Sequence, residues 1–433
     1  MQHRPLNVAM VAPFPPKDAI HGRLRGTASY TRNLVAHLCV DPHKARVKVF
    51  ANYLGHPEAT KRLPEFVPIN AEITEVFSSE RNCEVLRCWS ECAFYPLQIF
   101  GKIWSCRTEI DIIHIQHEYA QFGKSLSALL FPFLLGLLHL TRKPIIVTLH
   151  GIVEGNAVDS SFRNQHFLKV SLPFLRLGFN FIGRWTGRLA CSLIVHEEHT
   201  KRILQENYHL AEDKIEVIPH GVEIRKDTLE TGTAKRILGV ENRRVILFFG
   251  YLARYKGLEI LIEALGLLSA NRHVLLIAGA QVHHLQADPL YIEYLARLKQ
   301  AADNTQNDAV FSGFVPEERI SLYFSAADLV VFPYVDMHAC SGPFCLALSY
   351  KRPFLVSEAF ADFYGLPSEL RFRHTAESLG GKIEEFFESE SLGSIAGEWT
   401  EKFIRQRLWS SVANRTQEVY AKIHSGLADA SER

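Results

Sequence analysis

Short apolar runs alternate with helix-like segments along almost the whole chain, and this alternation restricts the possible folds more than any other feature. The runs are rich in Val, Ile and Leu, which is typical of strands covered on both faces. Because strands joined by helices form parallel sheets, the pattern predicts an α/β protein with doubly wound, Rossmann-like architecture. The strand candidates are residues 7–12, 47–51, 112–115, 145–149, 193–195, 216–218, 245–249, 274–278, 309–311, 329–333 and 354–357, and the helix candidates include 30–38, 258–268 and 292–302.

The alternation is interrupted once, at residues 223–244, which are polar and contain no strand candidate. A chain of 433 residues also exceeds one ordinary hydrophobic core. We therefore predict two facing Rossmann-like domains, residues 1–225 and 226–408, followed by a C-terminal helix over 409–433. Ligands of doubly wound sheets bind beyond the carboxyl ends of the strands, so residues that directly follow strands are the site candidates.

Charge and hydropathy restrict the partners and the location. With 48 basic and 47 acidic residues, the formal charge is +1, so no global field attracts the chain to nucleic acid. The N-terminus lacks the apolar stretch of a signal peptide. The longest apolar run, residues 125–140, is shorter than the roughly 20 residues of a spanning helix. These features predict a cytoplasmic protein with no nucleic-acid partner.

Two segments of the first predicted domain suggest an acceptor or phosphate site. Gly26 and Thr27 open a helix after the first strand, where backbone N–H groups favour an anion; a helix cap is the alternative. The strand at 112–115 leads to His117 and Glu118. A metal site is one interpretation of this cluster, but no fourth ligand is evident, so a carbohydrate or acid–base role is favoured. A buried structural histidine is the remaining alternative.

His150 follows the strand 145–149 and is itself followed by a glycine. An imidazole can hold or release a proton near neutral pH and can donate to a sugar hydroxyl. The glycine allows close approach of the backbone to a ligand. The alternative is a histidine that only fixes the loop.

The second predicted domain has two candidate donor-binding segments. Arg254 and Lys256 follow the strand 245–249 and precede a helix, an arrangement suited to a pyrophosphate. A surface charge pair is the alternative, although cations are disfavoured at a helix start. Ser341 and Gly342 follow the strand 329–333 and can form a nest of N–H groups for an anion or sugar; an ordinary turn is the alternative.

These motifs occur in one order and spacing, and in that order the chain resembles a family 4 (group 1) glycosyltransferase of the GT-B fold over nearly its full length. The matching segments are HIQHEYAQFG, VTLHG, VIPHGV, FFGYLARYKGLEILIEAL, FSGFVPEERISLYFSAADLVVFPY and SGPFCLALSYKRPFLVS. The resemblance implies transfer of a sugar from a nucleotide-diphosphate donor, with retention and without a metal or other cofactor. It also implies that the last helix packs back on the first domain.

The resemblance carries roles for individual residues. Gly26 and Thr27 match the glycine-rich loop near the donor phosphate and the acceptor, His150 matches the histidine that faces the donor sugar, and Lys256 matches the lysine on the diphosphate. The usual arginine after the strand glycine is here Tyr251, and Arg254 is expected to replace it.

The chain departs from the family pattern at the two glutamates that bind the donor sugar and ribose, which fall on His338 and Leu346. A subgroup of the family also lacks them, and the chain resembles that subgroup. Pro343 further removes one N–H from the predicted nest. An active hexosyltransferase is our prediction. The alternatives are a catalytically silent nucleotide-sugar-binding or scaffold subunit of the same fold, and a phosphorolytic enzyme of that fold.

The predicted partners are a nucleotide-sugar donor and a glycan, lipid-linked or small-molecule acceptor. Residues 125–140 are apolar, and residues 162–184 interleave aromatic side chains with Lys169, Arg176 and Arg184. Helices of this composition can lie in a bilayer interface and favour anionic lipid, which predicts peripheral contact at the inner face of the membrane. The alternative is that both helices only cover the first sheet.

Overall fold

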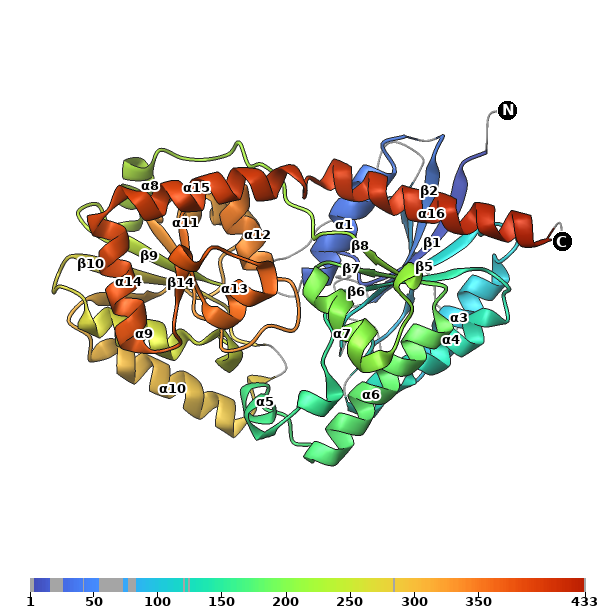
Figure 1. The fold of residues 1–433 in the computed structure, drawn as a ribbon, viewed down its shortest axis with the longest axis horizontal. Helices are drawn as coiled ribbons and strands as arrows, with labels where there is room; N and C mark the ends of the chain where they lie inside the picture. The colour runs from blue at the N-terminus through green and yellow to red at the C-terminus, as the bar shows by residue number, and fades with distance from the viewer. Residues whose placement is uncertain are drawn as a thin grey trace. The chain divides into compact units, whose positions relative to one another are not determined.

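The computed structural model describes residues 4–15, 26–41, 43–53, 73–76, 83–119, 121–123, 125–282 and 285–431. The chain divides into two compact units, coloured along the sequence in Figure 1. Unit 1 contains Met1–Val158, Pro173–Gly221 and Arg407–Arg433, and unit 2 contains Asp159–Leu172 and Val222–Gln406. The segment Asp159–Leu172, which the sequence analysis placed within the first domain, thus belongs to unit 2.

Unit 1 contains an eight-stranded sheet of order β3-β4-β2-β1-β5-β6-β7-β8. All neighbouring strands are parallel except β3, which is antiparallel to β4. The central strand β1 pairs Val8 with Val47 on one side and with Ile112 on the other. The strands are β1 Leu6–Val11, β2 Ala45–Asn52, β3 Ile73–Val76, β4 Cys83–Trp89, β5 Ile112–His117, β6 Ile145–Leu149, β7 Ser192–Val195 and β8 Ile215–Val217.

Helices cover both faces of this sheet, as Figure 1 shows. Alternate residues of β1 point to opposite faces: Met10 packs with α1 and α16, whereas Val11 packs in the core beneath α3, α4 and α6. Helix α16 lies against α1, and the Tyr420 hydroxyl bonds to His114 Nδ1 at 2.6 Å. The helices are α1 Gly26–Leu38, α3 Tyr95–Ser105, α4 Phe131–His139, α6 Leu172–Leu189, α7 Glu198–Tyr208 and α16 Trp409–Ser431.

The apolar run 125–140 forms two elements rather than one helix. A 3-10 turn, η1, spans Ser125–Leu130, and α4 begins at Phe131 with Pro132 in its first turn. Proline has no N–H to donate, so a helix accepts it in the first turn, where the N–H groups have no carbonyl partner within the helix. Pro132 therefore fixes the start of α4 at this point. None of the helices in the described ranges has the length and hydropathy needed to span a bilayer.

The predicted amphipathic helix over 162–184 is wrong in part. The structure has a short helix α5, Ser160–Gln165, a loop, and then α6. Phe167 in that loop has a φ of 52° and packs edge-on against Tyr291 of unit 2, while Lys169 forms an ion pair with Asp288 at 2.7 Å. A non-glycine residue in the left-handed conformation does not continue an α-helix. Phe167 and Lys169 therefore do not lie on one helix face with the residues of α6.

Unit 2 contains a six-stranded parallel sheet of order β11-β10-β9-β12-β13-β14. Its strands are β9 Arg244–Phe249, β10 His273–Ala278, β11 Asp308–Phe311, β12 Leu329–Phe332, β13 Phe354–Ser357 and β14 Arg371–Phe372. Besides α5, its helices are α8 Thr231–Leu238, α9 Leu258–Leu267, α10 Pro289–Asp303, α11 Glu317–Ala326, α12 Gly342–Ser349, α13 Glu358–Tyr364, α14 Ala376–Glu388 and α15 Glu390–Arg405.

Both sheets are doubly wound, which confirms the predicted α/β, Rossmann-like architecture of the two units. The strand order reverses between β1 and β5 in unit 1 and between β9 and β12 in unit 2. Loops after neighbouring strands diverge at such a reversal and leave room for a ligand. The segments that follow β5 and β9 are those in which the sequence analysis placed Glu118 and Lys256.

Candidate functional site

Lys256 is a buried cation at the strand-order reversal of unit 2. It ends a 3-10 turn, Arg254–Lys256, that follows β9, and it is 5% exposed. Its Nζ donates to the Tyr334 hydroxyl at 2.9 Å, and burial lowers the pKa of the ammonium group. Among the residues that the structure describes, no carboxylate forms an ion pair with it. A buried positive charge of this kind is suited to an anionic ligand.

Tyr334 connects Lys256 to Ser341. The Tyr334 and Ser341 hydroxyl oxygens are 3.0 Å apart, and Tyr334 follows β12, the neighbour of β9. Ser341 caps α12 by accepting from the N–H of Phe344 at 3.3 Å. The structure thus brings together two of the predicted donor-binding residues through a third residue that the sequence analysis did not single out.

The predicted nest of N–H groups at Ser341 and Gly342 is smaller than expected. The Ser341 N–H already donates to the Tyr364 hydroxyl at 2.8 Å, and Pro343 has no N–H. Phe344 N–H is taken by the cap. Among these described residues, the Gly342 N–H is therefore the donor left for a ligand.

Arg254 contacts a different part of unit 2. Its guanidinium donates to the carbonyl of Asn164 at 3.2 Å and lies over the rings of Phe167 and Tyr294, 4.5 and 5.2 Å from their centres. These contacts fix the segment Asp159–Leu172 on unit 2. The structure does not bring the Arg254 guanidinium into the Lys256–Tyr334 network.

Gly257 sets the conformation of the Lys256 turn. Its φ is 65°, and a Cβ atom would lie 1.9 Å from the Pro333 carbonyl oxygen. A strained backbone position costs about 1–3 kcal/mol. Gly257→Ala should therefore lower the free energy of unfolding by this amount or more. Urea denaturation measures this.

Gly239→Ala is the matched control for this variant, because Gly239 also has a positive φ, 71°, but no atom lies within 4 Å of the added Cβ. Equal destabilisation by the two variants would contradict a steric role for Gly257 beyond its backbone angle.

His150 directly follows β6 in unit 1 and is 9% exposed. Its Nε2 lies 2.9 Å from Gln116 Oε1, its Nδ1 lies 3.2 Å from His196 Nε2, and its ring meets Tyr30 edge-on at 4.6 Å. Burial, and then the neighbouring histidines, hold the pKa of His150 well below its usual value. His150 is therefore a neutral hydrogen-bonding group at pH 7.

His196 and His220 extend this cluster. His220 lies in the matched segment VIPHGV, whereas His196 was not singled out from the sequence. His196 Nδ1 lies 2.9 Å from the Ile218 carbonyl, so this nitrogen carries a proton that it donates. Burial lowers the pKa of His196 to about 3, and its Nε2 lies 3.2 Å from His150 Nδ1. His196 follows β7 directly, as His150 follows β6, and that shared position was the signal available in the sequence.

Thr27 and Glu118 lie together at the strand-order reversal of unit 1. The Thr27 hydroxyl donates to Glu118 Oε2 at 2.5 Å, which joins the start of α1 to the end of β5. Gly26 is the first residue of α1, and residues 16–25 before it lie outside the described residues.

His117 does not join Thr27 and Glu118. Its ring packs 4.0 Å from that of Phe131 in the core, and burial lowers its pKa to about 3. His114, three residues earlier, bonds to Thr148 and Tyr420 on the opposite face of the sheet. Because successive strand residues alternate between faces, the two histidines cannot form one metal site or one acceptor site.

The loop between β12 and α12 contains a carboxylate near a position of the missing glutamates. His338, which stands at one of those positions, lies 2.9 Å from Asp336 Oδ2. Burial opposes ionisation of Asp336, but the hydrogen bond and charge of His338 outweigh it and keep the pKa of Asp336 below its usual value. Asp336 is a candidate sugar-binding residue that the sequence analysis did not consider.

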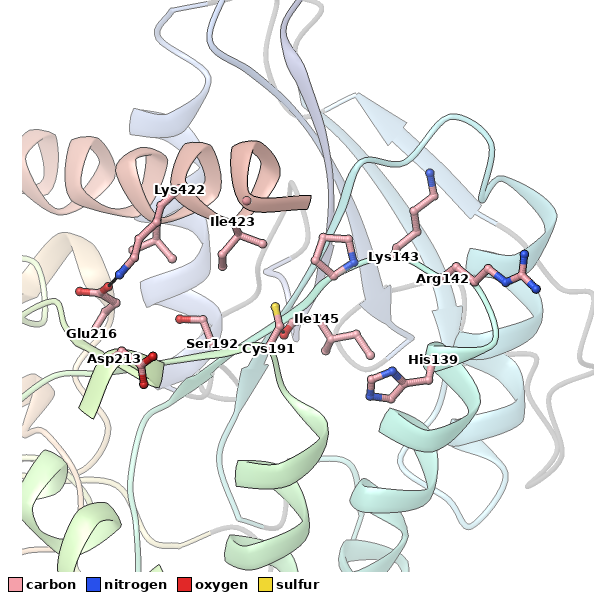
Figure 2. Close-up of a pocket in the computed structure, with 13 residues that line it drawn as sticks. His139, Arg142, Lys143, Ile145, Cys191, Ser192, Asp213, Glu216, Lys422 and Ile423 are labelled. Atoms are coloured by element: carbon pink, nitrogen blue, oxygen red, sulfur yellow. Dashed lines mark hydrogen bonds and ion pairs between the residues drawn. The ribbon is translucent and has the colours of Figure 1, made fainter. Parts of the chain in front are cut away.

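A cavity of about 490 Å³ lies at the opposite edge of the unit 1 sheet, by the amino ends of β6 and β7 (Figure 2). It is lined by Ile145 and Ser192 from these strands and by Lys422 of α16, which pairs with Glu216 at 2.7 Å. None of the predicted site residues lines this cavity.

Two family models match the chain. The model for Glycosyltransferase Family 4 matches residues 24–226, and the model for Glycosyl transferases group 1 matches residues 243–368. The chain therefore belongs to the family 4, group 1 glycosyltransferases, as its motifs predicted.

Solved structures of the same fold cover nearly the whole chain. Anabaena HepE, in complex with UDP and glucose, is 16% identical with a TM-score of 0.68 over 96% of this chain and 100% of that chain. Sucrose-phosphate synthase from Thermosynechococcus elongatus is 16% identical with a TM-score of 0.72 over 97% and 100%. The fold is thus the GT-B fold.

Curated relatives match over shorter stretches. The GDP-mannose:glycolipid 4-beta-D-mannosyltransferase of Xanthomonas campestris is 27% identical over 254 residues, 57% of this chain and 60% of that protein. The Bacillus subtilis protein YtcC is 24% identical over 233 residues, 51% of this chain and 54% of that protein. The chain thus spans little more than half the length of the curated relatives it matches.

Proposed function

We propose that this glycosyltransferase moves a hexose from a nucleoside-diphosphate sugar to a lipid-linked acceptor, with retention and without a metal. The observation that carries the donor assignment is Lys256, a buried cation tied through Tyr334 to Ser341 at the strand-order reversal of unit 2. The HepE structure, which holds UDP and glucose, supports the donor class. A cytoplasmic location is part of this proposal.

The proposed role of Lys256 is to neutralise the leaving group. Negative charge develops on the diphosphate as the bond to the sugar breaks, and a preorganised cation in a dry site stabilises that charge. The Gly342 N–H adds one backbone donor at the start of α12. Arg254 has a supporting role in this scheme, because it holds the segment Asp159–Leu172 instead of facing Lys256.

The proposed acceptor side comprises Thr27 and Glu118, with His150 oriented toward the sugar. The Glu118 carboxylate, which already accepts from Thr27, would accept a second hydrogen bond from an acceptor hydroxyl. The His150 ring is held in place by Gln116 and His196. A lipid-linked acceptor is consistent with the glycolipid named for the Xanthomonas campestris relative.

A catalytically silent subunit that only binds nucleotide sugar is the second candidate. The observation that favours it is that His338 and Leu346 stand at the two positions where the family has glutamates. Neither position therefore carries a carboxylate. Asp336 offers a replacement in the same loop. Hydrolysis of UDP- and GDP-sugars by the purified protein distinguishes the candidates, since a silent subunit would bind donor without turning it over.

If the protein is an active glycosyltransferase, His150→Ala should lower its turnover by up to about tenfold and should change its donor affinity little. A lost hydrogen bond of about 0.5–1.5 kcal/mol accounts for an effect of this size, and a group matched to the reacting sugar acts mainly in the transition state. Steady-state hydrolysis and titration calorimetry with UDP separate the two effects. His139→Ala, which changes an exposed histidine at the end of α4 in the same unit, is the control; unchanged turnover in His150→Ala would assign His150 a structural role.

A further inference from the structure

The outer side of one helical layer of unit 1 exposes an unusual number of large apolar side chains. In the described part of unit 1, Val40 is the only exposed large apolar residue that lies outside this layer. Phe174 and Leu177 are 70% and 66% exposed. Single exposed apolar residues are normal, but a group this large marks an interaction surface. The group, here called the apolar face, comprises Phe94, Leu97, Trp104, Phe133, Leu140, Phe174, Leu177, Phe181 and Trp185.

The helices that carry these side chains, or end beside them, form one layer. Helices α3, α4 and α6 lie side by side on one side of the unit 1 sheet in Figure 1, and each buries its inner side in the same core through Ile99, Leu135 and Ile182. His139 Nε2, at the end of α4, lies 2.8 Å from the Leu189 carbonyl at the end of α6.

The exposed residues of α6 form a single stripe on the helix. Phe174, Leu177, Phe181 and Trp185 are spaced by three or four residues, which places them on one side of a helix. Ile182, on the other side, is buried against the sheet. The helix therefore has two apolar sides, and only one of them is used by the fold.

The same layer is strongly basic, although the whole chain carries a formal charge of only +1. Arg107 lies over the ring of Trp104 at 4.2 Å, and Arg188 lies over the ring of Trp185 at 5.6 Å. The only carboxylate in residues 95–110, 131–144 and 172–189 is that of Glu109. The cations of these three segments are Lys102, Arg107, Arg142, Lys143, Arg176, Arg184 and Arg188.

Exposed aromatic rings beside cations are typical of surfaces that enter the interface of an anionic bilayer. In Figure 2, Arg142 and Lys143 extend away from Asp213 and Glu216, so these carboxylates do not neutralise them. The excess of cations over carboxylates complements the anionic headgroups of a phospholipid surface, which favours a bilayer as the partner of this face.

We propose that unit 1 binds an anionic lipid bilayer through the apolar face. The rings of α3 and α6 insert among the headgroups, and the surrounding cations bind the lipid phosphates. The purpose of this binding, access to a lipid-linked acceptor, rests on the proposed function. The binding to the bilayer does not.

Co-sedimentation with vesicles tests the proposal. The protein should sediment at low salt with vesicles that contain phosphatidylglycerol and phosphatidylcholine, and should be released at high salt or from pure phosphatidylcholine. Arg184→Glu/Arg188→Glu should weaken this binding by at least about tenfold, since each basic residue contributes about a factor of five. Phe181→Ser/Trp185→Ser should weaken it similarly.

Phe314→Ser is the matched control, because Phe314 is 46% exposed but lies in unit 2. It should bind vesicles like the wild type. UDP affinity should be equal in all these proteins, so failure to bind donor would count against the proposed function and not against the bilayer surface.

Quenching by brominated lipid gives a second readout that does not depend on the variants folding equally well. Trp104 and Trp185 are exposed, whereas Trp89 and Trp409 are buried, so bound vesicles should quench part of the emission. Trp104→Phe/Trp185→Phe should abolish that part. Absence of vesicle binding at any salt would overturn the proposal, as would self-association that Phe181→Ser/Trp185→Ser removes, which would make the face a protein interface.

Discussion

Arg407→Met should lower the free energy of unfolding by about 3–5 kcal/mol, because it removes the bidentate cation from the buried carboxylate of Glu197. Both guanidinium NH groups of Arg407 bond to the Glu197 carboxylate, at 2.5 and 2.7 Å, and the two side chains are only 9% and 8% exposed. The pair fixes the start of the C-terminal segment 407–433 beside α7. Urea denaturation followed by circular dichroism measures the loss in the transition of unit 1.

Two further variants separate the ion pair from general damage at this position. Glu197→Leu/Arg407→Met should recover much of the loss, since replacing both partners of a buried pair by apolar residues is often neutral. Lys422→Ala breaks the exposed pair between α16 and Glu216, at 2.7 Å, and should cost no more than about 1 kcal/mol. If Arg407→Met were no more destabilising than Lys422→Ala, the buried pair would have no special role in holding the C-terminal segment.

The sequence predicted the sheets well because apolar β-branched runs mark buried parallel strands wherever they occur. All eleven predicted strands are present, within one or two residues at each end. Strands β3, β4 and β14 were missed; in β4, Glu84 and Arg87 interrupt the apolar run. Arg87 is nevertheless buried, and it donates to the carbonyls of Phe14, Pro15 and Asn52, partners that come from distant parts of the chain.

The site was predicted at the level of strand ends but not at the level of contacts. Residues that follow strands are visible in the sequence, and Thr27, Glu118, His150, Lys256 and Ser341 do lie at the carboxyl edges of the two sheets. What each side chain faces depends on tertiary packing, which one-dimensional patterns do not contain.

Two residues show this limit. Arg254 is two positions from Lys256, yet it is drawn to the rings of Phe167 and Tyr294, which belong to distant segments. His117 is next to Glu118, yet the alternation of the strand turns its ring into the core.

Lys256→Met should weaken binding of UDP or GDP by about 10- to 150-fold, which corresponds to a charged hydrogen bond of about 1.5–3 kcal/mol. Titration calorimetry with each nucleotide measures the change. Arg254→Ala is the control, because its guanidinium contacts Asn164, Phe167 and Tyr294 and should affect affinity far less. If Arg254→Ala had the larger effect, the diphosphate would have to be assigned to Arg254.

Stability without ligand provides an independent test of Lys256. Burial lowers the pKa of Lys256, so the folded state disfavours its charged form and the unfolded state binds the proton more tightly. Stability should therefore rise with pH as Lys256 loses its proton, whereas UDP affinity should fall over the same alkaline range. Lys256→Met removes the buried charge and should unfold at an equal or higher temperature than the wild type while it binds UDP more weakly. A variant that lost stability and affinity together would instead indicate that Lys256 supports the fold through Tyr334 and does not bind the diphosphate.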